Sequence, residues 1–175
     1  MNITNEQADY LLRLPKKIIN KKGDLLPQIT ISQKFPFSER FELLSEKDDE
    51  FSFLWQIKQS SKNTLQISLH FQEDDSKIGL IRIDYSGAHT NPQTITENVP
   101  EKFHLYIGTQ IMQSHIHYYV QGYPTLAWAI PLSDDEFEIK EINENDFYAT
   151  LGNVIKAFAK TINIETEIKV ETLLF

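Results

Sequence analysis

The chain has 175 residues, of which 41% are hydrophobic and 11 are Phe, which is enough for one ordinary core, so we expect a single domain over 1–175. Its formal charge of −8 argues against a broad nucleic-acid-binding or anionic-membrane surface, because phosphates and anionic lipids repel such a field. The absence of Cys excludes disulfides, thiolate nucleophiles and Cys-ligated zinc, so any metal site must use His, Asp or Glu.

The amino-terminal segment predicts a short helix. Thr4 followed by Gln7 is a capping-box pattern, and the apolar residues after it recur at helical spacing until Pro15. The segment lacks the basic and apolar regions of a signal peptide, and no apolar run approaches the roughly 18 residues of a membrane span. We therefore expect a cytoplasmic protein that does not contact a membrane.

The middle of the chain has the period of β-strands. Apolar and polar residues alternate over 51–58 and 65–71, and short polar stretches of hairpin-loop length separate such runs. Residues 40–85 therefore predict an antiparallel meander. The segments 103–107, 115–120 and 127–130 are expected to add further strands, which brings the sheet to six or seven.

The carboxyl-terminal part predicts a helix and a last strand. Apolar residues of the segment 144–162 follow one helical face, with Asn143 or Asn145 available as the cap, and residues 164–171 alternate again. We expect an α+β fold, in which an antiparallel β-sheet (meander) packs its Phe-rich face against this C-terminal helix, with a short N-terminal helix.

Four of the five histidines lie between His89 and His117. In a half-buried strand 103–107, the apolar residues would turn His104 to the opposite face, and parity turns His115 and His117 outward in the next strand. The simplest register places His104 opposite His117, with His115 on the diagonal. His89 or Asp84 could complete a set of four ligands.

This cluster predicts a site for zinc or a similar divalent metal, made of Asp84, His89, His104, His115 and His117. Two alternatives stay open. The histidines could be hydrogen-bonding residues on the solvated face of a sheet, or they could perform metal-free acid–base chemistry. His70 is expected to be such a solvated residue.

Residues 82–92 read RIDYSGAHTNP and are followed by FHLY at 103–106 and HIHY at 115–118. This string is similar to small uncharacterised bacterial and phage-borne families with an R-x-D…G…H-x-N-P…H…H pattern. The likeness covers about residues 80–131. Because some similar families accompany toxin–antitoxin or defence loci, the resemblance implies mobile-element biology, without a catalytic assignment.

Three functions follow from these observations. In the first, the chain is an acidic metal-binding inhibitor that occupies a basic nucleic-acid groove on a host defence nuclease, as anti-CRISPR proteins do, and meets it through the acidic turns 48–50, 73–75 and 134–136. In the second, it is a phosphodiesterase or ribonuclease toxin, in which histidines act as base and acid and Arg82 neutralises the phosphate. The third is a metal-free interaction domain. The net acidity favours the first, with a basic protein surface as partner and no direct nucleic acid.

Overall fold

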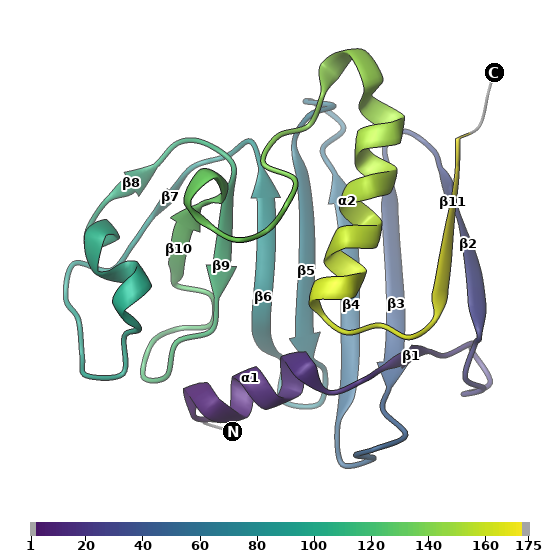
Figure 1. Ribbon diagram of the computed structural model, residues 1–175, viewed down its shortest axis with the longest axis horizontal. Helices are drawn as coiled ribbons and strands as arrows, with labels where there is room; N and C mark the ends of the chain where they lie inside the picture. Colours follow the sequence, from purple (N-terminus) through teal and green to yellow (C-terminus); the bar gives the residue numbers. More distant parts are fainter. Residues whose placement is uncertain (1–2, 173–175) are drawn as a thin grey trace.

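The computed structural model describes residues 3–172, and its central element is a seven-stranded antiparallel sheet (Figure 1). The strands lie in the order β1-β3-β4-β5-β6-β9-β10, so that β3 to β6 form the predicted meander and β9 follows β6. Their bounds are β1 (Lys17–Ile18), β3 (Ser38–Leu44), β4 (Ser52–Gln59), β5 (Ile67–Glu73), β6 (Ile78–Tyr85), β9 (His115–Tyr118) and β10 (Trp128–Pro131).

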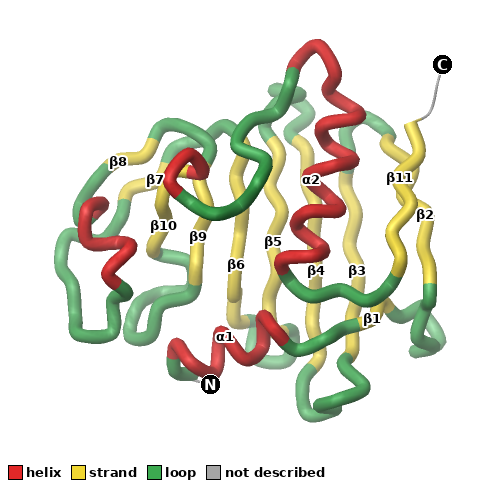
Figure 2. Tube along the Cα trace, in the orientation of Figure 1, coloured by secondary structure: helices red, strands yellow, loops and turns green. Residues whose placement is uncertain are grey.

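Both α-helices lie on the same face of this sheet, in front of it in Figures 1 and 2. Helix α1 (Asn5–Arg13) begins with the predicted capping box, in which Thr4 Oγ1 accepts from the Gln7 backbone at 3.1 Å and Gln7 Oε1 accepts from the Thr4 backbone at 2.9 Å. Helix α2 (Phe147–Thr161) follows the 3-10 turn η3 (Glu144–Asp146). Within residues 3–172, no helix combines the length and hydrophobicity that crossing a membrane requires.

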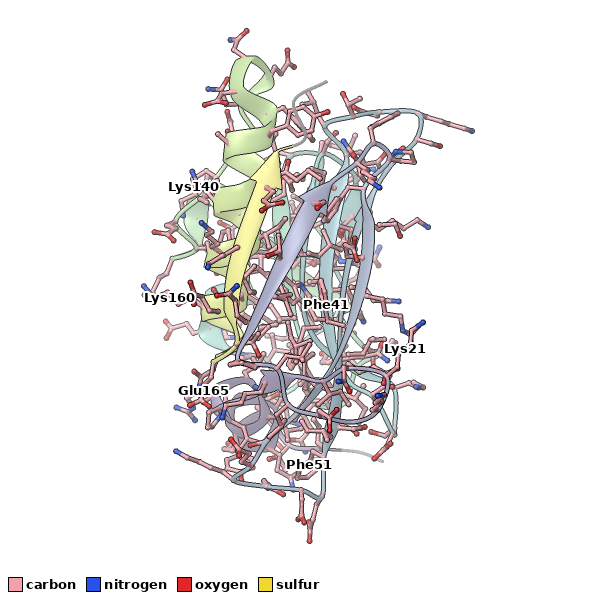
Figure 3. The ribbon with its side chains drawn as sticks, turned by 90° about the vertical axis from the view of Figure 1, so that its right-hand side faces the viewer. Lys21, Phe41, Phe51, Lys140, Lys160 and Glu165 are labelled. Atoms are coloured by element: carbon pink, nitrogen blue, oxygen red, sulfur yellow. The ribbon has the colours of Figure 1, made fainter. Side chains whose placement is uncertain are left out.

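The core lies between α2 and the sheet, which confirms the predicted α+β packing (Figure 3). Trp55 of β4 stacks on Phe158 of α2 at 6.1 Å between ring centroids, and Phe53 stacks on Phe71 at 5.4 Å. Strand alternation explains this arrangement, because every second residue of β4 and β5 faces the helices. The buried residues of α2 are Leu151, Gly152, Val154, Ile155, Ala157, Phe158 and Ala159.

Two small sheets flank the large one. The last strand, β11 (Glu167–Thr172), pairs in parallel with β2 (Gln28–Gln33), and β7 (His89–Thr90) pairs with β8 (Gln110–Ile111). A 3-10 turn, η2 (Leu132–Asp134), follows β10. The predicted final strand is therefore confirmed, although it pairs outside the central sheet.

The segment 103–107 is not a strand, and this prediction is wrong. It belongs to a 3-10 helix, η1 (Glu101–Tyr106), which follows Pro100. Phe103 packs against Trp128 with ring centroids 5.7 Å apart, whereas Leu105 is 88% exposed. Phe103 is the one fully buried apolar residue of this segment. The apolar residues at every second position therefore do not form the buried face of a strand, and the helical turn is held to the core by Phe103.

Candidate metal centre

The site forms where β6 and β9 lie side by side. Their register places Asp84 directly opposite His115 and Arg82 directly opposite His117. Such cross-strand partners share a face, and so do residues two apart on one strand, so all four side chains leave the sheet together. Ile83 and Ile116, which lie between them, are buried on the helix-covered face. The four polar residues therefore occupy the opposite face.

Three potential ligand atoms converge there. Asp84 Oδ2 lies 3.1 Å from His117 Nε2 and 3.6 Å from His115 Nε2, and the ligand atoms of all three residues lie within 4.8 Å of one another. Ligands roughly 2.1 Å from a tetrahedral zinc ion are about 3.4 Å apart. The two measured separations lie on either side of that value, so the cluster has the dimensions of three tetrahedral positions.

Backbone carbonyls orient both imidazoles. His117 Nδ1 lies 2.9 Å from the Leu126 carbonyl and His115 Nδ1 lies 2.7 Å from the Gln113 carbonyl. A carbonyl only accepts, so each Nδ1–H donates, and in the neutral ring each Nε2 keeps its lone pair. A backbone acceptor behind the ring is the usual support of a metal-binding histidine.

The charges at the cluster also suit a cation. His117 is fully buried, and this burial lowers its pKa to about 4, so the ring is neutral at pH 7. Burial by itself would raise the pKa of Asp84, but the charge of Arg82, whose Nε donates to Asp84 Oδ2 at 2.7 Å, opposes burial, and the pKa lies below its ordinary value. Neutral imidazole and ionised carboxylate are the forms that bind metals.

Arg82 contacts two of the three ligand residues. Its Nε donates to Asp84 Oδ2 at 2.7 Å, and its Nη2 lies 2.8 Å from His117 Nε2. The side chain is 33% exposed at its position on β6. A metal ion bound to the same two atoms would have to displace the guanidinium toward solvent.

The other predicted ligands have different environments. The His89 ring lies 4.5 Å from that of His117 between centroids, but its Nε2 donates to the Ala127 carbonyl at 2.9 Å, and burial lowers its pKa. His104 lies on η1, where its Nε2 donates to the Val99 carbonyl at 3.1 Å. Of the five predicted ligands, the structure gathers Asp84, His115 and His117, with His89 beside them. The predicted pairing of His104 with His117 is wrong because residues 103–106 are helical.

A cavity of about 740 Å³ opens beside the cluster, and Arg82, Asp84 and His115 line one side of it. Lys58 lies opposite Ser68 in the register of β4 and β5, and Ser68 lies opposite Asp84. Lys58 and Ser68 line the cavity, and so does Lys62 in the loop after β4. The sequence prediction missed these residues, because strand alternation marks Lys58 and Ser68 as polar-face positions but does not place them next to Asp84.

His70 is closer to the site than its sequence position indicates. It lies directly opposite Arg82 on β5, and its Nε2 donates to Gln72 Oε1 at 3.0 Å. Burial lowers the pKa of this ring as well. His70 therefore shares the polar face, one strand away from the cluster.

The chain matches, over residues 3–164, the model of a protein family described as a family of unknown function, DUF6978. No curated protein and no solved structure matches it.

Proposed function

The chain belongs to the DUF6978 family, and from the geometry of its site we propose that the protein binds one divalent metal ion of the zinc type through Asp84, His115 and His117. The observation that carries the proposal is the convergence of two imidazole Nε2 atoms on one carboxylate oxygen at 3.1 and 3.6 Å. Two imidazoles and a carboxylate, without thiolate, suit zinc and also Fe²⁺ or Mn²⁺. Three protein ligands leave a further coordination position, which a water or an exogenous ligand fills.

Metal titration by calorimetry tests this proposal. Chelator-treated protein should bind one equivalent of Zn²⁺, and saturation at about 100 times the Kd should stabilise it by about 2.7 kcal/mol, which a thermal melt detects. The variants Asp84→Ala, His115→Ala and His117→Ala should lose binding. The matched controls His70→Ala and His104→Ala should keep it.

The variant His89→Ala determines whether that ring supplies a fourth ligand. A loss as large as that of His115→Ala assigns it as a ligand, whereas a small loss assigns it as a neighbour that packs on His117. The proposal fails if purified protein contains no metal, calorimetry records no binding, and chelation leaves the melting temperature unchanged. A panel of Zn²⁺, Fe²⁺ and Mn²⁺ identifies the preferred ion.

We propose, as the wider role, that the protein acts by binding and meets a basic surface, such as the nucleic-acid groove of a host nuclease, in the cytoplasm. The turns 48–50 and 73–75 support this, because they connect β3 to β4 and β5 to β6 and so lie at the same end of four consecutive strands. The turn 134–136 follows β10, whose Pro131 pairs with His115 at the opposite end of the sheet. The proposed contact surface is therefore the first two turns alone, without Glu73, which is 3% exposed and accepts from the backbones of Asp75 and Ser76.

A labelled oligo-arginine peptide can serve as the probe for that surface. Asp49→Lys should weaken its binding and reduce the salt dependence, because it reverses a charge inside the proposed surface. Glu136→Lys makes the same charge change at the other end of the sheet, and both residues are exposed. Equal effects of the two variants would show that only net charge matters and would contradict the proposed surface.

The phosphodiesterase or ribonuclease alternative differs in predicting turnover. With binding as the role, metal-loaded protein leaves RNA and DNA intact. Cleavage that disappears in His115→Ala and His117→Ala, but not in His104→Ala, would replace the binding role with the nuclease.

A further inference from the structure

The cavity beside the metal cluster has a charge opposite to that of the whole protein. Three cationic side chains line it, those of Lys58, Lys62 and Arg82, against the single carboxylate of Asp84, whereas the chain as a whole carries −8. Among the residues that the structure describes, the ion pairs within 4.0 Å include neither Lys58 nor Lys62. Both lysines therefore keep their charge available to a ligand.

We propose that this cavity binds a phosphate-bearing small molecule of about the size of a nucleotide. Its volume of about 740 Å³ falls in the range of small-molecule sites, which is roughly 300–1,000 Å³. Lysine ammonium groups attract phosphate as point charges, and the planar guanidinium of Arg82 matches two phosphate oxygens. Serine hydroxyls of the same lining, including those of Ser60 and Ser68, add neutral hydrogen-bonding groups.

The strand register sets the span of the site. Lys58 on β4 and Asp84 on β6 belong to one cross-strand row, with Ser68 between them. Neighbouring strands lie about 4.8 Å apart, so Lys58 begins roughly 10 Å from the metal cluster. A ligand that reaches both must therefore be larger than a single phosphate ion, which favours a phosphate joined to a second polar group such as a nucleoside.

Arg82 couples this site to the metal centre, and this part of the inference rests on the proposed function. Its guanidinium binds Asp84 and His117, the same atoms that a metal ion would take, and the side chain also lines the cavity. A metal ion that displaces the guanidinium frees the N–H groups of Arg82 to donate to an anion in the cavity. Metal and phosphate ligand therefore bind with positive coupling, and by linkage each strengthens the other equally.

Calorimetry with adenosine monophosphate as the probe tests the cavity on the chelator-treated protein. Adenosine monophosphate should bind and adenosine should not, because the lysines recognise the phosphate. The double variant Lys58→Gln/Lys62→Gln should weaken binding at least tenfold. The charge-matched control Lys21→Gln/Lys22→Gln, in an exposed turn next to the other end of β3, should retain it.

The same titration on protein loaded with one equivalent of Zn²⁺ should give at least fivefold tighter binding. Equal losses in the two double variants, or no binding to wild-type protein, overturn the cavity proposal. Titrations of wild-type protein separate the two hypotheses. If wild-type protein binds zinc but not adenosine monophosphate, the cavity inference alone fails, whereas lysine-dependent nucleotide binding without any zinc binding removes the metal centre and its coupling.

Discussion

The side chains of Arg82 and His117 lie directly opposite each other on β6 and β9, with Arg82 Nη2 2.8 Å from His117 Nε2. A guanidinium carries donors only, so Nε2 must accept and the imidazole proton must lie on Nδ1. The Leu126 carbonyl, 2.9 Å from Nδ1, requires the same tautomer. The lone pair that Arg82 uses is therefore the one that a metal ion needs.

Removing the guanidinium should strengthen metal binding. In Arg82→Leu, we expect zinc affinity to rise by about tenfold, which corresponds to about 1.4 kcal/mol, near the lower end for a hydrogen bond to a charged group. Competition with a chromogenic zinc chelator measures the change. Arg40→Leu is the control, because Arg40 lies in the same cross-strand row but three strands away. Unchanged or weaker affinity in Arg82→Leu would show that the guanidinium does not compete with the ion.

The metal-free protein should lose stability in acid through His117. Burial lowers the pKa of this ring from 6.5 to about 4, so between these values the unfolded chain binds the proton and the folded chain does not. The stability that His117 contributes is therefore complete above pH 6.5 and falls as the pH drops to 4, by up to about 3 kcal/mol.

The variant His117→Asn isolates this contribution, because the Asn amide can still donate to the Leu126 carbonyl but does not titrate. Urea unfolding of chelator-treated protein at pH 7 and pH 4.5 should show a smaller acid loss in this variant than in wild type. His104→Asn, on η1, should keep the wild-type loss. The same loss in His117→Asn as in wild type would show that other groups cause it.

The fold followed from the sequence wherever a repeated pattern was long. The alternation of apolar and polar residues continues along most of β4 and β5, and the apolar face of α2 continues over several helical turns. Many packing contacts therefore favour the same secondary structure as the local sequence does. The segment 103–106 offered only two alternations, and Pro100 allowed a 3-10 turn that buries Phe103 alone. A short pattern could not distinguish a strand from a helical turn with one anchor.

The candidate site was predictable in part for the same reason. Strand parity alone places His115 and His117 on one face, whichever strands are their neighbours. Parity does not determine strand order, and it is the pairing of β9 with β6 that brings Asp84 to His115. The positions of Lys58 and Ser68 at the cavity depend on the register of two further strands, β5 and β4, which the alternation within each strand does not determine.

Asn91 is expected to be a structural residue of the segment beside the site. It is 2% exposed, its Nδ2 donates to the Ala129 and Tyr106 carbonyls at 2.8 and 3.0 Å, and its Oδ1 accepts from the Ala129 backbone at 2.8 Å. Asn91→Asp replaces the donor with a second acceptor facing two carbonyls. We expect a loss of about 2–4 kcal/mol in the free energy of unfolding, measured in urea.

The exposed Asn153 of α2 provides the control for that substitution. Asn153→Asp makes the same chemical change on a solvated surface and should alter stability by less than about 0.5 kcal/mol. A loss in Asn91→Asp that is no larger than this would show that the side-chain bonds to the edge of β10 do not contribute to stability.

Lys16 is predicted to stabilise the junction of the two helices with the sheet. Its side chain is buried, and its Nζ donates to the carbonyls of Leu14, Leu12 and Ile162 at 2.6, 3.0 and 3.0 Å, near the carboxyl ends of α1 and α2. Lys16→Met keeps the length of the side chain but leaves those acceptors without their donor, at about 1–3 kcal/mol for each one that water cannot reach. Burying the ammonium is itself costly, which offsets part of this loss. We therefore expect a net destabilisation of about 2 kcal/mol in urea unfolding.

The variant Lys17→Met is the control for this prediction. It removes the neighbouring surface pair with Glu46 and should cost less than about 1 kcal/mol. If Lys16→Met is as stable as wild type or more stable, desolvation outweighs the three hydrogen bonds and the assigned role is wrong.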